Sequence, residues 1–168
     1  ITPIPLAESC SWNPEMVRKS AAMAAREAAA AGIQLTYAPM VDISYDPRWG
    51  RISETSGEDT YVGKAMAVAR VKGFQGNDLS DASTVAACVK HFAGYGEGTG
   101  GSDYQETDVS SRTLHEIYLP PFQAAIDAGV AAVMCAYTSY DGEPATMNHY
   151  MNTEVLRNPV SYTHLRAH

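Results

Sequence analysis

The sequence is poor in cysteine, in basic residues and in long apolar runs. Its three cysteines, Cys10, Cys88 and Cys135, are odd in number and widely spaced, unlike a disulfide framework or a zinc site, so we expect three buried thiols. Twelve Lys and Arg stand against nineteen Asp and Glu, and the resulting charge of −7 has the wrong sign for a nucleic-acid-binding surface. No apolar run approaches the ~20 residues of a membrane-spanning helix, and residues 1–10 lack the pattern of a signal peptide. The sequence therefore argues against a nucleic acid partner and against a membrane span, and it carries no signal for an oligomeric state.

What the chain does contain is the composition of one ordinary globular domain, with 168 residues, 45% apolar and 18% charged. Short strand-like apolar runs alternate with longer helical patterns, which is typical of parallel βαβ units and predicts the α/β class. One helix is expected to begin at Pro14 after the N-cap Asn13 and to end just before Gly32, which suits a left-handed C-terminal cap. Its buried stripe is expected to be Val17, Ala21, Ala24, Ala28 and Ala31. A second helix is expected from about Asp59 to the region 73–76.

Polar or aromatic side chains follow each of three predicted strands. The predicted strand 35–38 is followed by the polar stretch 42–54, the strand 85–89 by Lys90 and His91, and the strand 131–135 by Tyr137. An α/β barrel places its functional site at the carboxyl ends of its strands, so these side chains are candidates for one site. About four βα units are visible, whereas a closed eight-stranded barrel needs about 250 residues. The sequence therefore predicts a partial TIM-type barrel.

Arg51 ends the segment Asp-Pro-Arg-Trp-Gly-Arg, residues 46–51, and is the first candidate for ligand binding. Its guanidinium has five fixed donors, which suit paired hydroxyls or a carboxylate. For Arg48 in the same segment we favour an ion pair with Asp42 or Asp46 over a ligand contact, and we expect Trp49 to serve in packing.

Lys90 and His91 offer an ammonium and an imidazole at one strand end, and one of them can face a pocket. A metal site is not expected, because His115 and His149 have no spacing to His91 that would bring ligands together. Residue chemistry alone leads to a pocket that binds a polyhydroxyl compound.

Other chemistries find little support. Residues 96–101 match G-x-G-x-x-G, but no helix opens there and Glu97 and Asp103 would repel a phosphate, so no dinucleotide cofactor is expected. No serine lies in a G-x-S-x-G elbow. Carboxylates such as Glu54 and Asp59 are expected to be solvated or to begin helices.

Taken together, several spaced motifs resemble the amino-terminal barrel of family 3 glycoside hydrolases, over residues 1–158 and closest to the bacterial β-glucosidase and β-xylosidase branch. The motifs are Ala38-Pro39-Met40-Val41-Asp42, Asp46-Pro47-Arg48-Trp49-Gly50-Arg51, Glu54, Gly57-Glu58-Asp59, Lys90-His91-Phe92-Ala93-Gly94-Tyr95-Gly96 and Leu119-Pro120-Pro121-Phe122. The run 93–96 departs from the Pro-Gly-His-Gly of the β-N-acetylglucosaminidase branch, which argues against an amino-sugar substrate.

Position by position, the resemblance implies a glycone-binding site. Arg51 matches the family arginine that hydrogen-bonds glycone hydroxyls, and Lys90 and His91 match the adjacent pair that grips the same sugar. Met134 and Tyr137 match residues that line the glycone pocket. The resemblance places the nucleophilic aspartate and the acid/base glutamate outside this chain, and it implies no metal and no cofactor.

The activity that the resemblance implies is that of a retaining, exo-acting β-glycosidase whose partner is a β-linked oligosaccharide or glycoside with a terminal β-glucoside. A β-xylosidase is the alternative within the family. A catalytically silent carbohydrate-binding barrel is the alternative from another class, because the candidate residues only grip sugar.

The last ten residues, 159–168, do not continue the family pattern. They resemble a translated sequencing adapter, so we expect a native domain over 1–158 followed by a non-native tail. A chain expected to be part of a barrel should also lack activity of its own. Relatives in this branch favour a periplasmic or extracellular location for the parent protein, although this chain shows no export signal.

Overall fold

A computed structural model of the chain describes residues 2–160, with side chains described through residue 158. The expected non-native tail lies outside the described residues, except that Pro159 and Val160 end the helix α6, Arg157–Val160.

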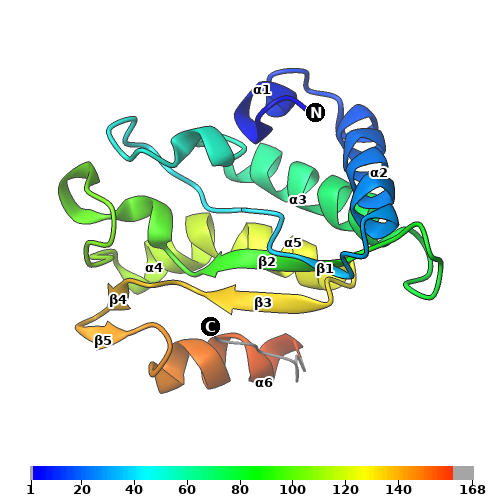
Figure 1. Cartoon of the computed structure of the whole chain (residues 1–168). Coiled ribbons are helices and arrows are strands. Elements are labelled where there is room, and N and C mark those ends of the chain that lie inside the picture. The colour runs from blue at the N-terminus through cyan, green and yellow to red at the C-terminus, as the bar shows by residue number, and fades with distance from the viewer. Residues whose placement is uncertain (1, 161–168) are drawn as a thin grey trace.

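A small parallel sheet forms the centre of the molecule (Figure 1). Its strands lie in the order β1, Leu35–Thr36, then β2, Ala86–Phe92, then β3, Ala132–Cys135. The register pairs Leu35 with Ala86 and Lys90 with Met134, and it shifts between Lys90 and Phe92. A separate antiparallel hairpin, β4 Ser139–Tyr140 and β5 Glu143–Pro144, follows β3.

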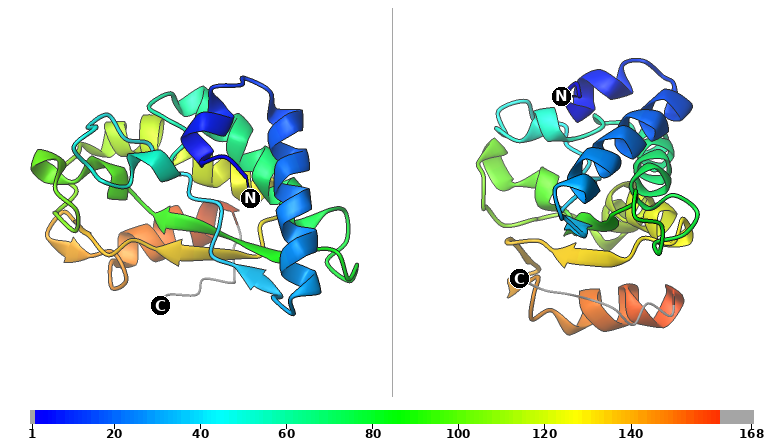
Figure 2. Two further views of the ribbon diagram at one scale, coloured as in Figure 1. Left: turned by 45° about the horizontal axis from the view of Figure 1, so that its top comes forward. Right: turned by 45° about the vertical axis from the view of Figure 1, so that its right-hand side comes forward.

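Helices pack against this sheet and against one another. The longer ones are α2, Pro14–Ala30, α3, Thr60–Gln75, and α5, Pro120–Asp127. Shorter elements are α1 Pro5–Ser9, η1 Ile52–Glu54, η2 Tyr95–Glu97, η3 Thr99–Gly101, α4 Ser111–Thr113, η4 Leu114–Tyr118 and η5 Tyr150–Val155. Helix α2 packs on α3, α3 packs on α5, and both α3 and α5 pack on β2, while η5 and α6 lie beyond β3 (Figures 1 and 2).

This architecture is the predicted one: α/β, with parallel strands connected through helices. The sequence predicted about four βα units, whereas the described residues contain three parallel strands that each lead into helical segments, preceded by helix α2. The main buried cluster lies between the sheet and these helices and includes Val71, Val89, Phe122 and Val133. The carboxyl ends of the strands are thereby held at one edge of a packed sheet.

Local capping chemistry explains where the long helices begin. The Asn13 side chain accepts a hydrogen bond from the Met16 backbone N–H at 3.1 Å, and the Asp59 side chain accepts one from Val62 at 2.8 Å. Both predicted starts are confirmed, and Gly32 has the left-handed φ of 84° expected after α2.

Two predictions about burial are wrong in part. The fully buried residues of α2 are Val17, Ala21 and Ala25, because a spacing of four keeps side chains on one line, whereas Ala24 and Ala28 are only half-buried and Ala31 is exposed. Cys88 and Cys135 are buried as expected, but Cys10 is exposed because it follows the short helix α1 in a turn. Within residues 2–160, no helix is long and apolar enough to cross a membrane.

Candidate sugar-binding site

Three chain segments meet at the carboxyl edge of the sheet. The Val41 backbone N–H donates to the Lys90 carbonyl at 2.9 Å, and the Ala136 N–H donates to the Phe92 carbonyl at 2.7 Å. Lys90 is also the register partner of Met134. The polar segment after β1, the end of β2 and the end of β3 are therefore side by side, as the parallel arrangement predicted.

Arg51 lies at this edge, immediately before η1, and is clamped by a carboxylate. Its Nε and Nη2 donate to the two Glu54 carboxylate oxygens at 2.7 and 3.0 Å. These hydrogen bonds raise the pKa of Arg51 and hold the pKa of Glu54 below its ordinary value. Glu54 was expected to be solvated or to begin a helix; its side chain is 41% exposed, but the turn of η1 also brings it next to Arg51, a pairing that the sequence did not predict. Three of the five N–H donors of Arg51 are not used by Glu54.

The neighbouring Arg48 has a different role. It pairs with Asp46 at 2.6 Å, and 71% of its side chain is exposed. The structure therefore confirms the predicted ion pair and selects Asp46, rather than Asp42, as its partner.

Lys90 is half-buried close to the Arg51–Glu54 pair. Burial lowers the pKa of Lys90, and the nearby Arg51 charge lowers it further. Together with Glu54 and Met40, Lys90 lines a cavity of about 190 Å³ beneath the amino-terminal segment. The ammonium group of Lys90 carries three donors, which suit a polar ligand in this cavity.

His91 is deeply buried and is held by a carboxylate. One oxygen of Asp42, Oδ2, lies 3.0 Å from the His91 backbone nitrogen and 2.9 Å from its ring Nδ1. Both side chains are almost fully buried. The ring stands edge-on to Tyr95, with 4.8 Å between the ring centroids.

Tyr95 begins an aromatic row that runs outward from the buried centre. Its ring contacts Trp49 and Tyr104 with centroid separations of 5.2 and 6.1 Å, and Tyr104 in turn lies 5.9 Å from Tyr137. The Trp49 indole N–H donates to Asp103 at 2.9 Å, which ties the loop carrying Tyr104 to the site. Tyr104 and Tyr137 are both largely exposed, at 65% and 62%. The row therefore ends in an open aromatic rim.

The five sequence-predicted residues divide into an inner and an outer group. Arg51 and Lys90 interact electrostatically, and Met134 is half-buried beside Lys90 in the sheet register. His91 lies next to Lys90 and contacts Tyr95, over whose ring the Arg51 guanidinium lies at 5.5 Å. Tyr137 lies outside this inner group and is linked to it through Tyr104 and Tyr95.

Sequence reasoning missed the roles of Asp42, Tyr95 and Asp103. Burial and the neighbouring Asp103 carboxylate raise the pKa of Tyr95. Asp103 and Trp49 lie 54 residues apart, and Asp42 and His91 lie 49 apart, so no local pattern joins them. The polar stretch that follows a strand predicts that its carboxylates lie at the edge of the site, but it does not predict which residues they bond to.

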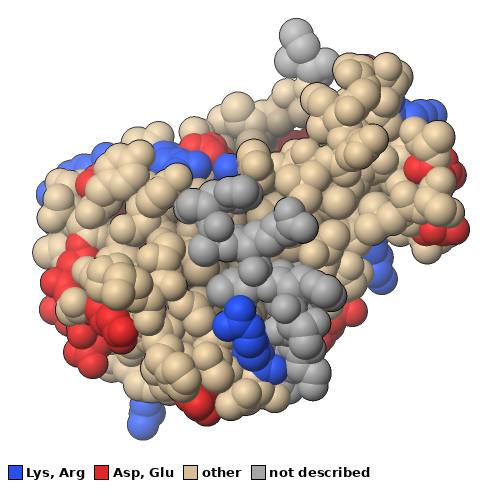
Figure 3. All heavy atoms as spheres, turned by 60° about the horizontal axis from the view of Figure 1, so that its bottom comes forward, with Lys and Arg blue, Asp and Glu red and all other residues tan. Residues whose placement is uncertain are grey.

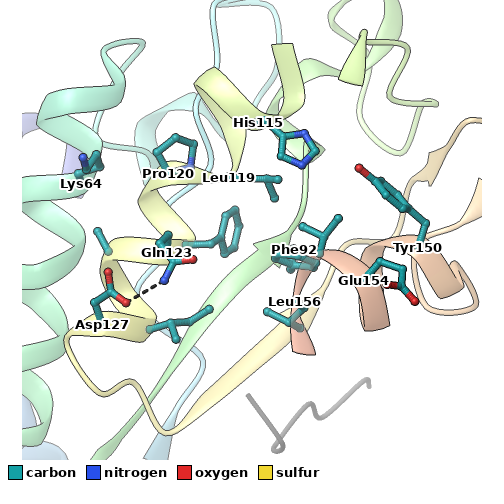
Figure 4. Close-up of a pocket in the computed structure, with 14 residues that line it drawn as sticks. Lys64, Phe92, His115, Leu119, Pro120, Gln123, Asp127, Tyr150, Glu154 and Leu156 are labelled. Carbon is teal, nitrogen blue, oxygen red and sulfur yellow. Dashed lines mark hydrogen bonds between the residues drawn. The ribbon is translucent and has the colours of Figure 1, made fainter. Parts of the chain in front are cut away.

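A larger cavity, of about 430 Å³, lies elsewhere, between α5 and η5 (Figure 4). Its walls are mainly apolar and include Phe92, Phe122 and Leu156, with His115 and Tyr150 at its side. None of the five predicted site residues lines it. Among the residues that the structure describes, no group of three or more His, Cys, Asp or Glu side chains is placed to hold a metal ion.

Comparison with known proteins gives concordant matches. The model of the glycosyl hydrolase family 3 N-terminal domain matches residues 1–163. A periplasmic β-glucosidase of Salmonella typhimurium is 46% identical over 157 residues, covering 94% of this chain and 20% of that protein. A β-xylosidase of Formosa agariphila is 39% identical over 166 residues, covering 96% of this chain and 23% of that protein.

Solved structures agree with these matches. A mutant β-glucosidase from Listeria innocua in complex with laminaribiose superposes with a TM-score of 0.97 at 43% identity, over 100% of this chain and 24% of that chain. A β-glucosidase involved in saponin metabolism, from intestinal bacteria, superposes with a TM-score of 0.96 at 38% identity, over 99% of this chain and 22% of that chain. The chain therefore spans about a fifth to a quarter of the length of the relatives that it matches.

Proposed function

Because the chain belongs to glycoside hydrolase family 3, as part of its amino-terminal barrel, we propose that the protein containing it is an exo-acting β-glycosidase that hydrolyses terminal β-glucosides. The relatives named as β-glucosidases favour a glucoside substrate. Residues 2–160 supply one wall of the site that receives the terminal sugar.

The observation that carries this proposal is the meeting of Arg51, Lys90 and His91 at the carboxyl edge of the sheet. A sugar ring presents several adjacent hydroxyls, each able to accept and to donate a hydrogen bond. The guanidinium fork suits two neighbouring hydroxyls, the ammonium suits a third, and the imidazole completes the set. Met134 adds an apolar surface beside Lys90.

In a retaining glycosidase, a carboxylate attacks the anomeric carbon, and water then releases the glycosyl-enzyme. We assign no residue of this chain to the nucleophile or to the acid/base. The role of Arg51, Lys90 and His91 is to fix the sugar so that its anomeric carbon meets those groups. Hydrogen bonds to ring hydroxyls that strengthen in the oxocarbenium-like transition state accelerate the reaction as well as bind the substrate.

A β-xyloside is the second candidate substrate, since β-xylosidases are among the similar proteins. A xylose ring lacks the hydroxymethyl group of glucose. The two substrates therefore share every contact proposed above except those made to that group.

The test is an assay of the complete open reading frame that contains this chain, with aryl β-glucoside and aryl β-xyloside as substrates. We expect turnover of the glucoside, and a loss of at least about tenfold in kcat/KM for Lys90→Met, because one hydrogen bond to a charged group is worth about 1.5–3 kcal/mol. Lys19→Met is the matched control, since the Lys19 side chain is 70% exposed on α2. A folded protein that turns over neither substrate contradicts the proposal, and it would favour a silent carbohydrate-binding barrel if it still bound glucose.

A further inference from the structure

His91 offers two ring nitrogens, and the structure treats them differently. Nδ1 faces Asp42 Oδ2 at 2.9 Å, and the same oxygen accepts the His91 backbone N–H at 3.0 Å. No hydrogen bond to Nε2 is formed within the described part of the chain.

We propose that Asp42 is a positioning residue that holds His91 with its proton on Nδ1 and presents Nε2 to the sugar as a hydrogen-bond acceptor. This inference rests on the proposed function, because it concerns the same sugar-binding edge. Asp42 acts through His91 and does not itself contact the substrate.

The chemistry of the two groups determines the direction of the contact. A carboxylate only accepts hydrogen bonds, so the nitrogen that faces it carries the proton. In a neutral imidazole the other nitrogen then has a free lone pair. The two hydrogen bonds to one oxygen fix both the backbone and the ring, so that Nε2 has one direction.

An acceptor at this position complements its neighbours. Arg51 and Lys90 can only donate, and the nearby Glu54 is occupied by the Arg51 fork. A sugar hydroxyl that accepts from a cation still has its own proton to donate. His91 Nε2 is placed to receive such a proton, which makes the edge selective for hydroxyls over groups that only accept.

Burial indicates that the pair does more than fill space. Asp42 is 3% exposed and His91 is 2% exposed. Asp42 Oδ1 is buried with no hydrogen-bond partner among residues 2–158. An unpaired buried carboxylate oxygen costs stability, so packing alone does not account for an aspartate at this position. Interaction with the charges of the site offsets part of this cost, because Asp42 lies within electrostatic range of Lys90.

The test is a double-mutant cycle in the complete protein, with kcat/KM for an aryl β-glucoside as the readout. Asp42→Asn keeps the size of the side chain and removes its charge. We expect a loss of roughly 10- to 100-fold, by analogy with the carboxylates that orient metal-bound histidines. In a His91→Ala background the same substitution should cost less than about twofold, because only its electrostatic effect on Lys90 then remains. Equal losses in both backgrounds, or no loss in either, would overturn the proposal.

Ser44→Ala is the matched control for packing of the segment. Ser44 is 1% exposed, two residues from Asp42, and its hydroxyl is also without a partner among the described residues. This variant should keep wild-type kcat/KM within about twofold. A loss as large as that of Asp42→Asn would assign the effect to packing and overturn the proposal.

A second pair of variants leaves Asp42 intact, so that a folding defect of Asp42→Asn cannot hide the answer. His91→Gln places its amide near the position of Nε2, whereas His91→Asn places its amide near Nδ1. We expect the glutamine variant to retain at least about fivefold more kcat/KM, because one hydrogen bond contributes about 1 kcal/mol. The opposite order would overturn the assignment of Nε2. A wild-type protein without turnover contradicts the proposed function instead, so the two failures are distinguishable.

Discussion

Replacing Arg51 by lysine isolates the contribution of its forked geometry, because the charge is kept. In the structure one side of the fork is bound to Glu54 at 2.7 and 3.0 Å. The remaining three N–H donors are not engaged by Glu54. The single ammonium of a lysine cannot satisfy Glu54 and two hydroxyls in the same directions, so at least one charge-assisted hydrogen bond to the sugar is lost.

The magnitude follows from the chemistry and the burial of the group. A hydrogen bond to a charged group is worth about 1.5–3 kcal/mol, and we take the lower end, about 1.5–2 kcal/mol, because 24% of the Arg51 side chain is exposed. That free energy corresponds to a roughly 10- to 30-fold lower kcat/KM. Thermal stability should change little, because an ion pair that is partly exposed contributes at most about 1 kcal/mol.

The assay is steady-state hydrolysis of an aryl β-glucoside by the complete protein, with Arg48→Lys as the control. Arg48 has the same chemistry three residues away, but it pairs with Asp46 and is 71% exposed. We expect the control to keep kcat/KM within about twofold. If both lysine variants retain the same activity, the reasoning that assigns sugar binding to the Arg51 fork is refuted.

Three further predictions concern stability, pH dependence and association. A methyl group added by Gly96→Ala would lie 2.1 Å from the Ile43 carbonyl oxygen. Denaturant unfolding of the complete protein should therefore show a free energy of unfolding lower by about 1–3 kcal/mol. Gly50→Ala, whose added methyl group has nothing within 4 Å, should leave it almost unchanged. The pKa of Lys90 is lowered from its ordinary value of 10.5, so affinity for glucose should fall as pH rises through a value below that of an ordinary lysine. In the Lys90→Arg variant, titration calorimetry should show this fall at higher pH, because a guanidinium keeps its charge. An unchanged pH profile contradicts the role of Lys90. The 168-residue chain expressed alone should aggregate or stay molten. Among the described residues, β1 and β3 each have an unpaired edge, and the described surface shown in Figure 3 is mainly uncharged. A monomer on size-exclusion chromatography that melts cooperatively contradicts this prediction.

Features that depend on neighbouring residues were predictable from the sequence. The helix starts at Asn13 and Asp59 depend on a side chain that bonds a backbone N–H three residues ahead. The start of α5 at Pro120 agrees with the preference of proline for the first turn of a helix. The position of the site also follows from a simple rule, since the ends of parallel strands meet at one edge.

The pairing of side chains within the site was not predictable in the same way. Asp42 meets His91 only because the segment after β1 runs beside β2 in one register. A shift of one residue would turn the other side chain of the segment toward the site. The pairing of Glu54 with Arg51 was also not predicted, although the two residues are only three positions apart. The η1 turn that brings their side chains together has no strong sequence pattern.

The most direct test of the account is a crystal structure of the complete protein with glucose bound. We expect sugar hydroxyls within about 2.7–3.2 Å of the Arg51 guanidinium, the Lys90 ammonium and His91 Nε2. Glucose bound away from these three groups, for instance in the cavity between α5 and η5, would contradict the account.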